Sequence, residues 1–241
     1  MNAAKRIIVI LLVLTAVAGI ACALYPATRN LAWKHESREA AEDFLYKAEI
    51  LPDIAEAIQA ASEEDRPPYY ELLCDMRAYN ERIYHEGQSG LDGEEAYQAA
   101  ALELADYGLE DIIAVISLPS LGLEMPLYLG ANSDNMSKGA AVLGQTSLPI
   151  GGTNTNCVIA GHRGWNGADY FRHLNELQAG DAVTVTNLWG ELTYHVKEIA
   201  VIQPDDIDAV KIQGGKDMLT LITCHPYASG GRYRLAVYCE R

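Results

Sequence analysis

The second half of the chain is a series of short β-type segments, and this pattern constrains the fold more than any other feature. Seven runs rich in branched and aromatic residues follow Gly108, with Gly, Pro, Asn and Asp between them: DIIAVISLP, MPLYLG, NCVIAGH, DAVTVTNL, LTYHVKEIAVI, DMLTLITC and YRLAVYCE. Val183 and Val185 alternate with threonines, which is typical of a strand with one buried face. Seven or eight strands with no long helix among them predict a mainly β domain, either a closed barrel or a sandwich.

The N-terminus carries a membrane-type pattern. Lys5 and Arg6 precede residues 7–24, an uncharged run of about 18 residues that is long enough to cross a bilayer. Positive charge before the run orients the N-terminus in the cytoplasm. We therefore expect a signal anchor, a single crossing of the cell membrane and an extracellular location for the rest of the chain. A cleaved signal peptide with its site at residues 21–23 and a lipoprotein signal ending at Cys22 are the alternatives.

The region between these two parts has helical periodicity. Apolar residues recur at steps of three and four in two stretches, which are Ala41, Phe44, Leu45, Ala48 and Leu51, and then Leu72, Leu73, Met76, Tyr79 and Ile83. Pro67-Pro68 separates the stretches, and the loop HEGQSGLDGEE leads into a further helical piece at residues 94–105. We divide the chain into an anchor at residues 1–24, a helical region at residues 25–108 and a β domain at residues 109–241.

Charge and cysteine content exclude several classes of function. A net charge of −15 argues against a nucleic-acid partner, because such a chain cannot neutralise a row of phosphates. The five cysteines form no CxxC pair and no framework spacing, so neither a disulfide scaffold nor a zinc site is expected. A bond between Cys157 and Cys239 remains an alternative to two buried thiols. Nothing in the sequence requires a cofactor.

Cys224 is the candidate nucleophile, because it ends the run LTLITC. A thiol nucleophile needs a histidine to remove its proton or to stabilise its thiolate. Side chains alternate along a strand, so the neighbouring His225 is expected to point away from Cys224. His162 is the better partner, because it ends the run VIAGH and is followed by Arg163-Gly164.

An arginine near the last strand completes the candidate site. Arginine stays charged and has several donors in a fixed fork, which suits stabilisation of an oxyanion. The segment GGRYRLAVYCE offers Arg232 and Arg234, two residues apart and expected on the same side of the strand. Taken singly, a cysteine at a strand end is more often a small buried hydrophobe, and a histidine beside glycines a turn residue. Cysteine, histidine and arginine at three strand ends of one exported domain favour catalysis.

These segments resemble the signatures of sortases, the cysteine transpeptidases of Gram-positive cell surfaces. TLITC, IAGHRG and the terminal RLAV carry the resemblance, and it extends over LGQTSLPIGG, FRHLNELQAGDAVTV and PDDIDAVKIQGGKDMLTLITCHPY, from about residue 112 to the C-terminus. GHRG and LPIGG point to class C, the pilin-polymerising branch. The resemblance implies an eight-stranded closed barrel with Cys224 as nucleophile and His162 as general acid and base. Arg234 takes the place of the family arginine, with Arg232 as the second choice.

The resemblance also implies the reaction. A sortase cleaves an LPXTG-like sorting signal of a secreted protein between Thr and Gly and transfers the acyl group to an amine. That amine is a lysine of a pilin in pilus assembly, or belongs to a peptidoglycan precursor in attachment of surface proteins to the cell wall. Class C enzymes commonly carry a lid with an Asp-Pro-aromatic motif. This sequence has no Asp-Pro dipeptide, so we expect an open site, with the helical region as the alternative cover.

Three other functions share some of these features. A cysteine protease-like hydrolase would use the same dyad but release an acid. A non-catalytic surface module would not need Cys224 at all. A metal site formed by His162, His173 and Cys224 is the remotest alternative. Otherwise His35, His85, His173 and His195 are predicted to be ordinary residues, with His173 on a short helical turn at the edge of the site at best.

Overall fold

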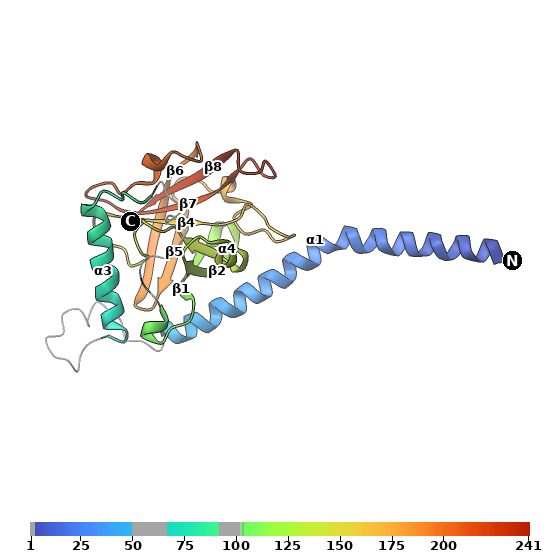
Figure 1. Ribbon diagram of the computed structural model, residues 1–241, viewed down its shortest axis with the longest axis horizontal. Coiled ribbons are helices and arrows are strands. Elements are labelled where there is room, and N and C mark those ends of the chain that lie inside the picture. The colour runs from blue at the N-terminus through green and yellow to red at the C-terminus, as the bar shows by residue number, and fades with distance from the viewer. Residues whose placement is uncertain (1–2, 50–66, 92–101, 103) are drawn as a thin grey trace.

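Eight strands close into a β-barrel in the computed structural model. Figure 1 shows how the helices are arranged around this barrel. The structure describes residues 3–49, 67–91, 102 and 104–241. The strands are β1 (Ile112–Leu118), β2 (Leu123–Leu129), β3 (Ala140–Val142), β4 (Thr155–Ala160), β5 (Ala182–Asn187), β6 (Gly190–Ile202), β7 (Asp217–His225) and β8 (Tyr233–Glu240). Their order around the barrel is β1-β2-β3-β4-β7-β8-β6-β5. The prediction of a mainly β fold with an eight-stranded closed barrel is confirmed.

Two of the neighbouring strand pairs are parallel, and one of them positions the site. β2 runs parallel to β3, and β4 runs parallel to β7, whereas the other neighbours are antiparallel. Parallel strands end at the same edge of a sheet. The ends of β4 and β7 therefore bring the segments that follow Ala160 and Ile222, which are register partners, to one edge of the barrel.

Burial along the strands follows from what covers each face. In β5, Val183 and Val185 are buried and the intervening threonines are half-buried, as the alternation predicted. Every residue of β4 is buried, because its outer face is covered as well as its inner one. Val158 and Ala160 belong to a second apolar cluster, which includes Leu91 and lies apart from the main core.

Helix α3 (Tyr70–His85) packs its predicted apolar face against the barrel. Leu72, Leu73, Met76, Tyr79 and Ile83 are all buried, and they join the barrel core in one cluster. Burying each of these large side chains contributes roughly 1.5–3 kcal/mol. Asn80 fixes the register of this packing, because its side-chain amide donates to the carbonyl of Leu148 (3.3 Å) and its oxygen accepts from the Leu148 N–H (2.7 Å).

The remaining helical elements are short, apart from one. Among the described residues they are the long helix α1 (Ala3–Glu49), the short helix α4 (Ser133–Lys138) and the 3-10 turns η3 (Leu104–Tyr107), η4 (Pro119–Leu121), η5 (Leu174–Glu176) and η6 (Ile207–Val210). Most of the helix predicted at residues 94–105 lies outside the described residues, as does Leu51.

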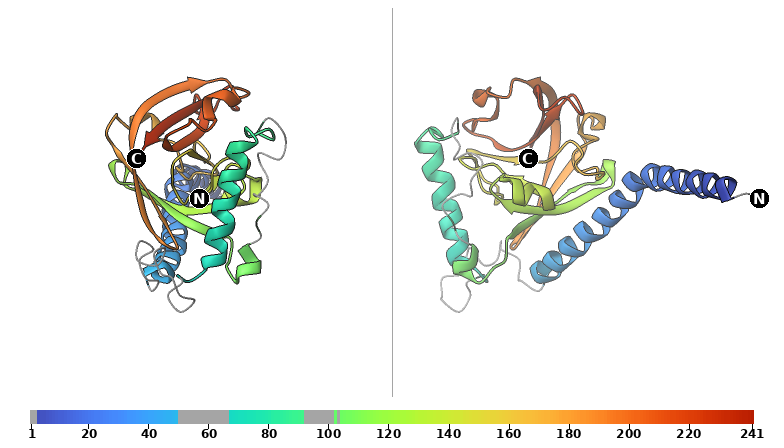
Figure 2. Two further views of the ribbon diagram at one scale, coloured as in Figure 1. Left: turned by 90° about the vertical axis from the view of Figure 1, so that its left-hand side faces the viewer. Right: turned by 45° about the vertical axis from the view of Figure 1, so that its right-hand side comes forward.

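Helix α1 (Ala3–Glu49) is one continuous helix, although the sequence suggested an anchor and a separate helix after it. It passes through Pro26 and is bent partway along its length (Figure 1), as a proline inside a helix causes. Its apolar N-terminal half projects away from the barrel (Figure 2) and is exposed, and it is long and apolar enough to cross a membrane. Its C-terminal half packs on the barrel through buried Trp33, Ala41 and Phe44.

Candidate active site

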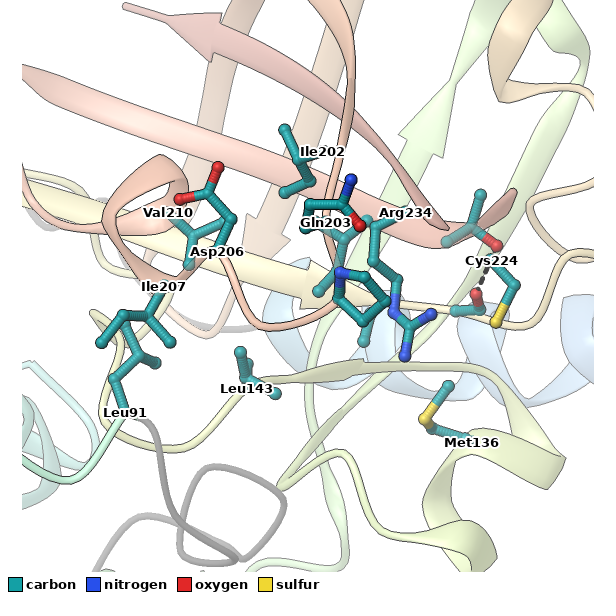
Figure 3. A pocket seen from close by; sticks show the side chains of 15 residues that line it. Leu91, Met136, Leu143, Ile202, Gln203, Asp206, Ile207, Val210, Cys224 and Arg234 are labelled. Carbon is teal, nitrogen blue, oxygen red and sulfur yellow. Dashed lines mark hydrogen bonds between the residues drawn. The ribbon is translucent and has the colours of Figure 1, made fainter. Parts of the chain in front are cut away.

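Cys224 and Arg234 are register partners on the antiparallel strands β7 and β8. Both side chains line a groove of about 160 Å³, and Figure 3 shows the Arg234 guanidinium reaching toward Cys224. Opposing residues of an antiparallel pair lie close enough for their side chains to interact. The barrel thus brings a thiol and a permanent cation to one end of the groove.

The groove is mainly apolar and extends away from Cys224. Its other lining residues are Leu91, Met136, Leu143, Ala160, Gly161, Ile202, Gln203, Pro204, Asp206, Ile207, Val210, Ile222 and Thr223. Figure 3 places Leu91, Ile207 and Val210 at the end far from Cys224. An apolar groove with a few polar groups at one end is the usual form of a site that binds a peptide or small ligand.

Arg234 is held by the backbone of the loop before β8. Its Nη1 donates to the carbonyl of Gly231 (2.7 Å) and to that of Tyr233 (3.2 Å). Gly231 has a φ of +82°, and a Cβ at this position would lie 3.4 Å from Cys224 Sγ and 3.0 Å from Arg234 Nη1. The loop therefore approaches both side chains closely, which requires glycine. No pattern in the sequence indicates this role of Gly231.

Arg232 occupies a different environment from Arg234. It is exposed and precedes β8, which begins at Tyr233, so the expectation that both arginines share one face of the strand is wrong. Its backbone N–H donates to Ser229 Oγ (3.4 Å), and its side chain is not part of the groove lining. The geometry brings Arg234, and not Arg232, to Cys224.

His162 and Cys224 occupy matching positions when the register of the β4–β7 pair is continued past the end of β4. The last register pair of β4 and β7 is Ala160–Ile222. One residue further along each segment, Thr223 Oγ1 donates to the carbonyl of Gly161 (2.7 Å). The residues that come next are His162 and Cys224. The imidazole is half-buried, and burial lowers its pKa below 6.5 because the charged form loses hydration. His162 is not among the residues that line the groove.

Two aromatic rings enclose the imidazole of His162. It stacks on Trp165 with centroids 4.8 Å apart, and it meets Tyr170 edge-on at 5.9 Å. Gly161 makes this arrangement possible, because a Cβ there would lie 2.5 Å from the buried ring of Phe171. The glycines around His162 thus serve close packing of the loop as well as its turn.

Arg163 joins the two segments that carry His162 and Cys224. Its Nη1 donates to the carbonyl of Cys224 (3.4 Å) and lies 2.6 Å from Nδ1 of His225, and its Nη2 donates to Asn175 Oδ1 (2.7 Å). A guanidinium only donates, so Nδ1 of His225 accepts and that imidazole is neutral. His225 bonds Arg163 and does not line the groove. The sequence analysis named Arg163 only as part of GHRG and assigned it no role.

The other cysteines and histidines lie in ordinary environments. Cys157 and Cys239 are both buried and unbonded, and burial raises the pKa of both thiols, to about 12 for Cys239. His173 is exposed and bonds Glu176 (2.7 Å). His35, His85 and His195 are also exposed. Within the described ranges, no group of three or more His, Cys, Asp or Glu residues could hold a metal ion, so the alternative site of His162, His173 and Cys224 does not form.

Only one described residue from before position 109 lines the groove. This residue is Leu91, at the end of the groove far from Cys224. Nearby Gln88 fixes the segment that carries Leu91: its Nε2 donates to the Gln145 carbonyl (2.9 Å), and its Oε1 accepts from the Ile212 N–H (2.7 Å). Helices α1 and α3 contribute no side chain to the groove lining. Among the described residues, therefore, neither helix covers Cys224 within the groove.

Comparisons with known proteins agree on one family. The sortase domain model matches residues 116–241, just over half of the chain. The chain is 28% identical over 129 residues to sortase D of Bacillus subtilis (strain 168), an alignment that covers 53% of this chain and 62% of that protein. The chain thus spans a little under two thirds of the length of this curated relative.

Solved structures extend the similarity over the helical region. The structure of Clostridium perfringens sortase C with the C-terminal cell wall sorting motif superimposes with a TM-score of 0.65 at 30% identity, covering 85% of this chain and 98% of that one. Sortase C1 of GBS pilus island 1 superimposes with a TM-score of 0.68 at 29% identity, again covering 85% and 98%. The structural neighbours are class C sortases, in agreement with the resemblance read from GHRG and LPIGG.

Proposed function

Since the chain belongs to the sortase family, we propose that it is a membrane-anchored cysteine transpeptidase. It cleaves an LPXTG-like sorting signal between Thr and Gly and transfers the acyl group to an amine. The observation that carries this proposal is the pairing of Cys224 with Arg234 at the end of an apolar groove, with His162 level with the thiol.

In the first half-reaction, the Cys224 thiolate attacks the carbonyl carbon of the scissile Thr-Gly bond. Negative charge develops on the carbonyl oxygen, and the Arg234 guanidinium donates to it. His162, in its protonated form, gives its proton to the leaving glycine nitrogen as the C–N bond breaks. The products are a thioester that joins the Thr carbonyl to Sγ and the C-terminal fragment of the substrate, which leaves with a free amino group on its glycine.

In the second half-reaction, an amine attacks the thioester carbon. His162 is neutral after the first step and accepts a proton from this amine, so the same ring serves as acid and then as base. Burial favours the neutral imidazole, which suits the second role. An amide bond forms, the C–S bond breaks, and the Cys224 thiolate and the protonated His162 of the starting state are regenerated without any cofactor.

The groove supplies a binding surface for the sorting signal. An apolar lining suits the Leu and Pro of an LPXTG-like sequence, whose side chains lose contact with water on binding. The structural neighbour from Clostridium perfringens is described with a C-terminal cell wall sorting motif, which supports a substrate of this class.

We assign the accepting amine to a pilin lysine, and thus the enzyme to pilus assembly. The support is the class C character of the structural neighbours, one of which is described as a pilus island enzyme. Attachment of surface proteins to a peptidoglycan precursor is the alternative, and it differs only in the amine that enters the second half-reaction. The exposed apolar half of α1 supports anchoring in the cell membrane, with the barrel on the outer side of a Gram-positive cell.

The test uses the full chain in detergent micelles, incubated with an LPXTG-containing peptide and analysed by mass spectrometry. Three arms contain a pilin-type lysine peptide, a peptidoglycan-type amine, or no added amine. Transfer to the lysine peptide supports pilus assembly, and transfer to the second amine alone supports the anchoring role. Release of acid in all three arms, with no amide product, would mean a hydrolase of the cysteine protease type.

A further inference from the structure

Residues 162–171 form a hairpin that carries His162 and is held by backbone hydrogen bonds between its two arms; we call it the 162–171 hairpin. The carbonyl of His162 accepts from the Phe171 N–H (2.9 Å), and Trp165 and Ala168 exchange backbone hydrogen bonds of 3.0 and 2.8 Å. Its tip is Asn166-Gly167, with φ values of +47° and +86°. Positive φ at both central residues is the geometry of a type I′ turn, for which Asn-Gly is the preferred sequence.

Helix α1 holds this hairpin from outside the barrel. Tyr25 Oη donates to Asn166 Oδ1 (2.9 Å) at the tip. Gly167 lies against the helix so closely that a Cβ there would be 3.2 Å from the side chain of Arg29 and 3.3 Å from Pro26. The helix and the tip are therefore in direct contact.

Asn30 and Asp169 form the strongest polar contact between the helix and the hairpin. Asn30 Nδ2 donates to the Asp169 carboxylate (2.6 Å), and the Asp169 N–H donates to Asn30 Oδ1 (3.0 Å). Both bonds are partly buried, and the first is charge-assisted, a type that is stronger than a neutral bond. Lys34, one turn further along the helix, lies 3.9 Å from the same carboxylate.

An aromatic series leads from α1 to the imidazole. Trp33, which is buried, packs on Tyr170 with ring centroids 4.5 Å apart, and Tyr170 contacts His162 edge-on. Tyr170 is itself fixed, because its hydroxyl donates to the carbonyl of Ser137 (2.6 Å). Trp165 is the last ring of the series and stacks on His162. The position of the ring thus depends on contacts that begin on α1.

We propose that Trp33 and Asn30 of α1 are positioning residues for His162, so that the helix we assign to the membrane anchor also orders the general acid and base. The inference rests on the proposed function for its catalytic consequence. Its structural part stands on the hairpin contacts alone. A loop held only at its two ends samples several conformations, and a displacement of a catalytic group by about 1 Å can cost roughly a hundredfold in rate.

The first test uses the full chain and exchanges the amide and the carboxylate of the Asn30–Asp169 contact. Asn30→Asp places a second carboxylate against Asp169 and should lower kcat roughly tenfold or more, with little change in KM, because the groove is untouched. Asn30→Asp combined with Asp169→Asn restores one donor and one acceptor and should recover most of the activity. Leu31→Ala, on the exposed face of the same turn, should leave kcat within about twofold.

The second test asks whether the effect passes through His162. Trp33→Ala should lower kcat, and Trp33→Phe, which keeps a ring against Tyr170, should retain most of it. In a His162→Ala background, Trp33→Ala should cause little further loss, because residues that act through one group are not additive. An equal further loss in that background would overturn the inference.

Histidine NMR separates this inference from the proposed function. The ring protons of His162, assigned by their loss in His162→Gln, report the ring currents of Trp165 and Tyr170. Asn30→Asp and Trp33→Ala should shift these resonances, and Leu31→Ala should not. Unchanged resonances in both variants would refute the positioning role even if activity fell. If the wild type shows no acyl transfer, the proposed function fails, and the resonances still decide this structural contact.

Discussion

Arg234 faces Cys224 from the neighbouring strand and is tethered by the carbonyl of Gly231, which itself lies against the sulfur. The three residues come from the end of one strand, the start of the next and the loop between them. A single β-hairpin thus holds the candidate nucleophile, its candidate oxyanion donor and the close backbone approach that fixes both.

Replacing Cys224 with Ala should abolish formation of the amide product, because no other described thiol lines the groove. Far-UV circular dichroism and the unfolding midpoint should stay close to those of the wild type. Cys74→Ser is the matched control, since Cys74 is half-buried on α3 and does not line the groove, and it should keep substantial activity. Full product formation by Cys224→Ala would disprove the assignment of the nucleophile.

Arg234→Lys should lower kcat/KM roughly a hundred- to a thousandfold, the usual cost of losing an oxyanion donor. Lysine keeps the positive charge but cannot both reach the Gly231 carbonyl and present a second donor in a fixed fork. Arg232→Lys is the control, because Arg232 is exposed in the preceding loop, and its activity should stay within a few-fold. Equal losses in the two variants would contradict the choice of Arg234.

His162→Ala should reduce the rate of acyl transfer roughly a hundred- to ten-thousandfold, because it removes the general acid and base. His225→Ala should have a much smaller effect, since that imidazole bonds Arg163 and lies outside the groove. Single-turnover assays that follow the thioester by mass spectrometry would measure both steps. If the two variants were impaired to the same degree, the placement of the proton-transfer group would be wrong.

Gly231→Ala should impair catalysis by crowding the Arg234 guanidinium, because the new Cβ would lie 3.0 Å from Arg234 Nη1. Gly230→Ala is a sharp control, because Gly230 also has a positive φ of +68° but no atom lies within 4 Å of its Cβ position. Both variants should lose roughly 1–2 kcal/mol of stability from left-handed backbone strain. Only Gly231→Ala should also lose activity. Urea unfolding measures the loss of stability in both variants, and kinetic measurements on the folded proteins show which of them has lost activity.

The lowered pKa of His162 predicts how stability responds to acid. The unfolded chain binds the proton more tightly than the folded protein, so the free energy of unfolding should fall as pH decreases through 6.5 toward the folded pKa. At higher pH the His162 ring is neutral in both the folded and the unfolded state, so it no longer makes stability depend on pH. His162→Gln lacks the group, so its loss of stability between about pH 7.5 and about pH 5.5 should be smaller than that of the wild type in urea unfolding. A larger loss in the variant would contradict the burial of a neutral ring.

Alternation and periodicity gave the barrel strands and the buried face of α3 from the sequence alone. These features are local, since one strand or one helical turn contains the whole pattern. β3 was missed because Ala140–Val142 is too short to show a period. The continuity of α1 was missed because Pro26 normally ends or kinks a helix.

The site was predictable where a residue's chemistry was distinctive, as at Cys224 and His162. Gly231, Gln88 and Arg163 were overlooked, because their roles depend on contacts between segments far apart in the chain. The Asn166-Gly167 turn was a readable hairpin signal, since this dipeptide favours positive φ at both positions. No sequence pattern indicates that Asn30 would meet Asp169, because a contact across 139 positions is set by the packing of the helix on the barrel.

The unbroken course of α1 has a consequence for where the enzyme works. Trp33 follows Leu24 by nine residues, and a helix rises about 1.5 Å per residue. If residues 7–24 span the bilayer, the 162–171 hairpin is held within roughly 14 Å of the lipid surface. The helix would then set a fixed distance between the membrane and the site, so that, under the proposed function, only substrates close to the membrane surface would reach Cys224.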